Sequence, residues 1–213
     1  MKCSPKVSGM LVCISLLATA TTAGAERSPV PAKPHIVDVG GDANHLYLVD
    51  QPTPVTRPEA DLLAAWFSSD GKNLTAHWHV AASPVEGDVT FSIRVDPAPD
   101  DPYAATRNAK RCFIFAVVFP APDDPWSPYA HAGRRCADVI LDIPTKPQFR
   151  TLTDGSFVVS TTYAMSGQFP FRRGHQLSAP YATAGVFTVI PNNGYEGVPR
   201  IDSTPTGLDY RIP

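Results

Sequence analysis

Short runs in which apolar and polar residues alternate make up much of the chain after residue 35. In residues 73–80 every second position is apolar: Leu74, Ala76, Trp78 and Val80. Side chains at alternate positions of a strand lie on one face, so this pattern predicts a strand with one buried face. Comparable runs, bounded by Asp-Gly, Pro or Asn-rich turn segments, predict the other strands. The predicted strands are 45–50, 61–67, 73–81, 88–96, 111–119, 136–143, 156–164 and 185–190.

Two further patterns indicate how these strands are stacked. Residues 112–119 are continuously apolar, as expected for a central strand covered on both faces. Residues 158–163 mix β-branched residues with hydroxyls, which suits a strand open to water on one side. The 23 prolines argue against a helical bundle, because proline lacks the N–H that a helix interior needs. The sequence therefore predicts an all-β fold, a two-sheet jelly-roll-like β-sandwich.

Residues 58–66 fit two local structures. Pro58 followed by Glu59 and Asp61 is typical of a helix start, and a helix of about two turns is one interpretation. The Asp-Gly pair at 70–71 follows at once, however, and leads into an alternating run. We favour a strand–turn–strand hairpin, since Asp-Gly between two such runs is a strong hairpin signal.

The first 25 residues have the pattern of a secretory signal peptide. Two lysines precede an apolar stretch at 10–17, and small residues follow up to Ala25, where cleavage is expected. The stretch is shorter than the ~20 residues that a membrane-spanning helix needs, so we expect no membrane span. We predict a signal peptide at 1–25, a Pro-rich linker at 26–34 and a single domain at 35–213 of a secreted, extracellular protein.

Two cysteines, Cys112 and Cys136, remain after the predicted cleavage. In an exported chain they are most simply interpreted as one disulfide. It would close a loop of about 25 residues and contribute roughly 3–4 kcal/mol. Thiol catalysis or a metal site is the alternative, but no His lies at metal-ligand spacing from Cys112.

Charge and motifs exclude several function classes. The 18 Lys and Arg are balanced by 20 Asp and Glu, so the basic excess of nucleic-acid binders is absent. The sequence contains no Gly-x-Ser-x-Gly elbow, no His-Glu-x-x-His motif and no phosphate-binding Gly loop. A dispersed Ser/His/Asp triad has no fixed spacing, and no catalytic residue is predicted.

Three passages carry a resemblance to a known group of proteins. They are the acidic, Gly-containing segment 38–44, the hairpin 61–80 with its Asp-Gly turn, and the closing segment 198–210. Together they resemble the secreted, mostly actinobacterial β-sandwich proteins related to family-9-like carbohydrate-binding and DOMON-like modules. The resemblance implies a two-sheet jelly roll, often with a structural calcium, and sometimes a sugar or haem ligand. No Met/His pair matches by position, so haem is not expected.

The opening of the domain offers candidate calcium ligands. Asp38, Asp42 and Asn44 supply hard oxygen ligands within seven residues, and two glycines between them let the backbone turn. Calcium takes 6–8 oxygens, so more ligands are needed. Asp202 or Asp209 would complete the shell if the two chain ends lie side by side, as the resemblance suggests. The alternative is an Asx-rich turn whose carboxylates bond their own backbone.

Two aromatic residues are candidates for ligand binding. Trp126 and Tyr129 lie in the Pro-rich segment 120–134, which we expect to be a loop. Exposed aromatic rings of this kind form stacking platforms for a sugar ring or a partner protein. They also fold back to cover the open end of a sandwich, and both interpretations stand at this point.

Three remaining features have simple interpretations. His77 and His79 lie on the same face of a predicted strand. They are interpreted either as two metal ligands or as a solvated pair. Pro-Ala-Pro-Asp-Asp-Pro occurs at 97–102 and again at 120–125. The two copies would lie at opposite ends of the sheet if the preceding strands pair antiparallel, which favours two independent loops. Asn73 begins a glycosylation sequon.

These observations favour binding over catalysis. We expect a secreted, non-catalytic binding module whose partner is a sugar or a cell-envelope polymer, with calcium as its candidate cofactor. The alternative is a secreted hydrolase or a protease-associated accessory protein.

Overall fold

The computed structural model describes residues 29–45, 55–85, 88–102, 104–105, 109–120, 127–136, 139–186, 189–190, 194–195 and 200–213. The predicted signal peptide lies outside these residues, and so does the first part of the predicted linker. Within the described ranges, no helix has the length and apolar character needed to cross a membrane.

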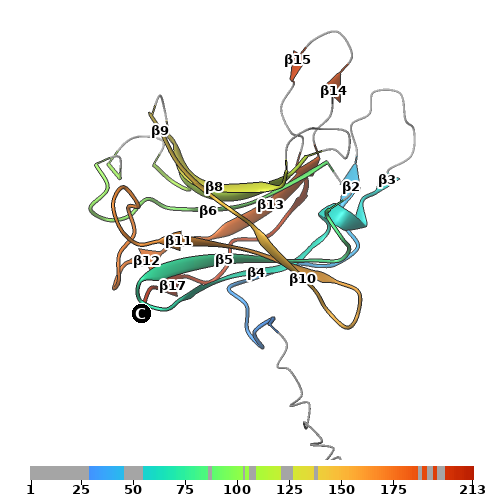
Figure 1. Ribbon diagram of the computed structural model, residues 1–213, viewed down its shortest axis with the longest axis horizontal. Coiled ribbons are helices and arrows are strands. Elements are labelled where there is room, and N and C mark those ends of the chain that lie inside the picture. The colour runs from blue at the N-terminus through green and yellow to red at the C-terminus, as the bar shows by residue number, and fades with distance from the viewer. Residues whose placement is uncertain are drawn as a thin grey trace, which may run out of the picture.

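Two antiparallel sheets lie one above the other, as Figure 1 shows. The five-stranded sheet has the order β1 (Ile36–Val37), β4 (Leu62–Ser69), β5 (Asn73–Val80), β11 (Phe157–Ala164) and β10 (Gln148–Thr151). The six-stranded sheet has the order β16 (Arg200–Ser203), β13 (Tyr181–Val186), β6 (Val89–Val95), β7 (Phe113–Phe119), β8 (Tyr129–Cys136) and β9 (Val139–Thr145). The predicted all-β, sandwich-like fold is confirmed.

Short elements complete the fold. Three two-stranded pairs are β2 (Asn44–His45) with β3 (Val55–Thr56), β12 (Gln176–Leu177) with β17 (Tyr210–Arg211), and β14 (Val189–Ile190) with β15 (Gly194–Tyr195). One turn of 3-10 helix, η1 (Pro58–Ala60), precedes β4.

The core fills the space between the two sheets and is rich in aromatic rings. Phe115 of β7 meets Phe67 of β4 edge-on, with 5.3 Å between ring centroids, and meets Tyr163 of β11 at 5.4 Å. Edge-to-face contacts of this kind add to the free energy of burial. The largest fully buried side chains include Trp78, Tyr163, Phe91, Phe113, Phe115, Phe119, Phe169 and Phe171.

The hairpin predicted at 61–81 is present as β4 and β5. Gly71 has a φ of 84°, a conformation that glycine adopts without strain. The Asp70 carboxylate accepts the backbone N–H groups of Lys72 and Asn73 at 2.8 and 2.6 Å. The helix considered for 58–66 is reduced to η1, because the following residues pair with β5.

Two strand predictions are wrong. The run 136–143 takes in the last residue of β8 and most of β9, with 137–138 outside the described residues, and β8 occupies part of the segment expected to be a loop at 120–134. The run 185–190 takes in the end of β13, which starts at Tyr181, and the separate β14, with 187–188 outside the described residues. The inward positions of β8 are Ala130 and Ala132, which carry too little apolar bulk to give a clear alternating signal.

The antiparallel pairing of β6 with β7 places the first hexapeptide copy and Pro120, the first residue of the second copy, at opposite ends of the sheet. Asp101 of the first copy is 6% exposed and accepts from Nε of Arg134 at 2.8 Å. This ion pair fastens the loop to β8. Of the second copy, only Pro120 is described.

The two cysteines lie at the same end of neighbouring strands. Cys112 directly precedes β7, Cys136 ends β8, and Phe113 pairs with Arg134. Cys112 is buried. The side chain of Cys136 lies outside those described, so the disulfide stays a prediction.

Candidate functional site

Three of the four predicted metal ligands come together in the folded chain. Asp38, Asp42 and Asp202 each offer a carboxylate oxygen, and the three oxygens lie within 4.8 Å of one another. The side chain of the fourth, Asn44, lies outside those described.

Both sheets contribute to this acidic cluster. Asp38 follows β1, and its backbone N–H donates to the carbonyl of Leu63 in β4 at 3.1 Å. Asp202 lies in β16, where it pairs with Ala184 of β13. Its Oδ2 accepts the backbone N–H of Leu62 at 2.6 Å, so the side chain reaches from the six-stranded sheet to the five-stranded one.

Asp61 is a fourth carboxylate beside the cluster, although it is not one of the three whose oxygens lie within 4.8 Å of one another. The sequence did not indicate it as a ligand. It directly precedes β4 and is 4% exposed. Its Oδ2 accepts the N–H of Gly41 at 2.7 Å, beside Asp42. Its buried Oδ1 has no hydrogen-bond partner in the described structure, and the same holds for Oδ2 of Asp38. The one sequence signal that could have identified Asp61 was an acidic residue at the start of the predicted apolar strand 61–67.

Burial and the charges of neighbouring carboxylates raise the pKa values of Asp38, Asp61 and Asp202. Burial, with the charges of Asp38 and Asp42 adding to it, raises the pKa of Asp202 to about 7, against the hydrogen bond from Leu62. Burial is also the main cause that raises the pKa of Asp38 and of Asp61. Ionising the cluster is therefore costly, and a cation placed among the oxygens would reduce that cost.

A separate cavity of about 420 Å³ lies between β9 and β11. Two hydrogen bonds join the strands around it. The Tyr163 hydroxyl donates to the His131 carbonyl at 3.0 Å, and the Thr145 hydroxyl donates to the Thr162 carbonyl at 3.1 Å. The lining residues bear hydroxyl, amide and apolar groups and no charge: Ile143, Pro144, Thr145, Thr162, Tyr163, Ala164, Ser166, Gln168 and Phe169.

The two aromatic residues predicted to bind a ligand do not line this cavity. Tyr129 begins β8, is 45% exposed and stacks on His131 with 6.3 Å between ring centroids. Trp126 lies outside the described residues. A stacking role for the pair stays a prediction.

His77 and His79 share a face but bind different partners. His77 lies flat on Trp66, with ring centroids 4.9 Å apart, and its Nε2 bonds the Ser68 hydroxyl at 2.8 Å. Nε2 of His79 bonds the Ser156 hydroxyl at 2.8 Å. Burial lowers the pKa of both, that of His77 to about 4. They are therefore half-buried and hydrogen-bonded, rather than the solvated pair we considered.

The His79–Ser156 contact continues to Asp154, which accepts from the Ser156 hydroxyl at 2.6 Å. In a hydrolytic triad the carboxylate contacts the histidine, where it fixes the tautomer of the ring. Here the carboxylate contacts the serine instead. Asp154 also accepts the N–H of Ser156 at 3.0 Å, which indicates a turn between β10 and β11.

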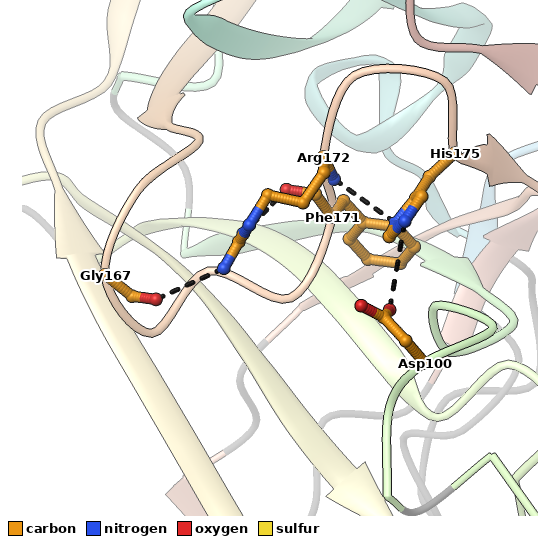
Figure 2. A network of polar contacts seen from close by, with 5 residues as sticks. All are labelled: Asp100, Gly167, Phe171, Arg172 and His175. Carbon is orange, nitrogen blue, oxygen red and sulfur yellow. Dashed lines mark hydrogen bonds and ion pairs between the residues drawn. The ribbon is translucent and has the colours of Figure 1, made fainter.

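Another polar network holds the loop that follows β11 (Figure 2). Arg172 donates from its guanidinium to the carbonyls of Phe171 and Gly167 at 2.9 and 3.3 Å. Its backbone N–H donates to Nδ1 of His175 at 3.3 Å, and Nε2 of His175 lies 3.9 Å from Oδ1 of Asp100. Asp100 belongs to the loop after β6, so the network connects loops of the two sheets.

Comparison with known families, curated proteins and solved structures finds no match for this chain, so its resemblance to carbohydrate-binding and DOMON-like modules stays an expectation.

Proposed function

We propose that the protein is an exported, non-catalytic binding module whose ligand is an uncharged glycan chain, such as a neutral polymer of a cell envelope. The cavity between β9 and β11 is the observation that carries this proposal. Small-molecule sites combine apolar walls with a few polar groups that fix orientation. The hydroxyl of Ser166 and the amide of Gln168 are such groups, and they match the neutral hydroxyls of a sugar.

The absence of charge from the lining supports binding without cleavage. Glycoside hydrolysis uses a pair of carboxyl groups on either side of the scissile bond. The nine residues that line the cavity include no Asp or Glu. A glycan held there would lack an acid to protonate its leaving group.

Affinity electrophoresis of the purified protein through gels containing neutral or anionic polysaccharides tests this proposal. We expect retardation by a neutral polysaccharide. We also expect Gln168→Ala to weaken it at least tenfold, because the variant removes an amide from the cavity. Gln148→Ala is the matched control, since Gln148 is exposed on β10 and does not line the cavity.

Other outcomes would overturn the proposal. If no neutral polysaccharide retards the protein, glycan binding is excluded. If Tyr129→Ala abolishes retardation while Gln168→Ala leaves it intact, the exposed aromatic ring holds the ligand in place of the cavity.

Export belongs to the same proposal and has its own test. The chain recovered from the medium of the source organism should begin at Glu26, directly after the predicted cleavage position. Mass analysis of the intact secreted chain measures this. A cell-associated chain that keeps residues 1–25 would contradict it.

A further inference from the structure

We propose that Asp38, Asp42 and Asp202 bind one calcium ion, with the buried carboxylate of Asp61 beside it, and that the ion holds the two sheets of the sandwich together. This site goes beyond the proposed glycan binding and does not depend on it. It also differs from the site expected from the sequence, because Asp61 lies beside it.

The spacing of the carboxylates fits a single ion. Oxygens bound to one calcium lie at 2.3–2.6 Å from it, so any two of them lie within about 5 Å of each other. The ligand oxygens of Asp38, Asp42 and Asp202 lie within 4.8 Å of one another and meet this condition. Asp202 lies 160 or more positions from Asp38 and Asp42 in the sequence, so local chain geometry did not bring it there.

The buried side chain of Asp61 is an independent sign of a missing partner. It is 4% exposed, and its Oδ1 has no hydrogen-bond donor in the described part of the chain. Its other oxygen accepts from Gly41, which orients the carboxylate toward the loop that holds Asp38 and Asp42. Buried polar atoms are almost always paired, because leaving one unpaired costs free energy. A cation among the carboxylates would supply the partner of Asp61.

The chemistry of the ligands selects calcium among divalent cations. All four side chains offer carboxylate oxygens, which suit hard cations, whereas zinc and copper favour His and Cys. The three carboxylates that lie within 4.8 Å of one another supply up to six oxygens, and water would complete the 6–8 that calcium takes in a flexible arrangement. Magnesium demands near-ideal octahedral geometry and keeps several waters, which crowded carboxylates do not favour.

The position of the site indicates what the ion does. Asp38 and Asp42 lie in the loop after β1, and Asp61 directly precedes β4, so these three belong to the five-stranded sheet. Asp202 belongs to β16 at the edge of the six-stranded sheet. One ion bound to Asp38, Asp42 and Asp202 would cross-link the sheets and would stabilise the folded chain by mass action.

Calorimetric titration and thermal unfolding of the purified protein, first stripped of metal with a chelator, test the site. We expect one calcium per chain and a melting temperature that rises by several degrees in millimolar calcium. Magnesium at the same concentration should give a smaller rise. Terbium, a luminescent substitute for calcium, should bind and be displaced by calcium.

Three variants locate the binding. Asp61→Asn should weaken calcium binding at least tenfold while its amide oxygen still accepts from Gly41. Asp42→Asn should do the same, and because Asp42 is exposed this variant does not depend on core packing. Asp100→Asn, in the loop after β6, is the control and should bind calcium like the parent protein.

The opposite results overturn the site. Identical melting curves in chelator and in calcium, with no heat of binding, would show that the protein binds no calcium. Equal weakening by Asp42→Asn and Asp100→Asn would show diffuse attraction to negative charge instead of a built site. Normal binding by Asp61→Asn would show that Asp61 takes no part in the site.

Discussion

Leu62 in β4 donates its backbone N–H to Oδ2 of Asp202 in β16 at 2.6 Å, across 140 residues of sequence. The register of β4 against β5 shifts between Leu62 and Ala64. Such a bulge disrupts the local ladder of hydrogen bonds and leaves backbone groups in need of other partners. A side chain from the opposite sheet therefore provides the acceptor for a strand whose ladder is interrupted.

Replacing Asp202 by Ala should lower the free energy of unfolding by about 1–3 kcal/mol, because the buried N–H of Leu62 would lose its acceptor. Asp202→Asn keeps an acceptor and removes a buried charge beside Asp38 and Asp42. In chelator at pH 8 it should be close to the parent protein in stability. Urea unfolding measures both variants, and equal losses for Asn and Ala would contradict this explanation.

His77 should make the protein less stable in acid. Burial lowers its pKa to about 4 from the 6.5 of an exposed histidine. Between these two pH values the unfolded chain takes up a proton that the folded chain does not, so the free energy of unfolding falls as the pH falls. At 1.36 kcal/mol for each pKa unit, the loss between pH 7.5 and 4.5 is up to about 3 kcal/mol.

The raised pKa values of Asp38, Asp61 and Asp202 act in the opposite direction, since these carboxyls hold protons more tightly in the folded chain. The contribution of His77 is therefore measured as a difference. Urea unfolding of the parent and of His77→Gln at pH 7.5 and 4.5 should show a smaller acid loss in the variant. The same pH dependence in both proteins would be evidence against a depressed pKa.

Gly207→Ala should be destabilising through a direct clash. A Cβ at this position would lie 2.4 Å from the His35 carbonyl oxygen and 2.6 Å from Cγ1 of Ile36. The segment is held there because Leu208 donates to His35 at 2.7 Å. Forcing an extra methyl into a packed contact typically costs about 1–3 kcal/mol.

Gly174→Ala is the matched comparison for Gly207→Ala. Gly174 has a φ of 86°, but a Cβ there would meet nothing within 4 Å. Only the strain of the left-handed backbone remains, roughly 1–2 kcal/mol. Urea unfolding should therefore rank Gly207→Ala as the more destabilised variant, and the reverse order would contradict the clash.

The predicted disulfide has a direct test. The intact secreted chain should be two hydrogens lighter than the sum of its residues and should contain no titratable thiol. Reduction should lower the free energy of unfolding by roughly 3–4 kcal/mol, the chain-entropy value for a loop of about 25 residues. Two free thiols in freshly secreted, unreduced protein would exclude the bond between Cys112 and Cys136.

Local sequence was sufficient for much of the fold. The strands β5, β6, β7 and β11 lie close to their predicted positions, because each carries either strict alternation or a continuous apolar run. The β4–β5 turn was equally clear, since Gly71 takes a positive φ that most residues avoid. These features depend on side-chain periodicity and backbone conformation, both of which are encoded over a few residues.

The position of β8 depends on packing against the neighbouring strand, and the local sequence pattern did not predict it. In β8 the inward residues are Ala130 and Ala132, which pair with Val117 and Phe115 of β7. A small residue beside a large one fills the core evenly, but the small residue alone gives no strand signal. The location of β8 was therefore fixed by its neighbour.

The acidic cluster, too, could be predicted from the sequence only in part. The sequence identified Asp38, Asp42 and Asp202 as oxygen ligands from their residue type and from the resemblance, and the fold brings them within 4.8 Å. Asp61 gave no such signal, because its importance arises from burial and from an oxygen left without a donor. Residue type determined which groups are available to hold a cation. Only the stacking of the two sheets decided which of them are buried together, since burial and electrostatic repulsion depend on distances that the linear chain does not contain.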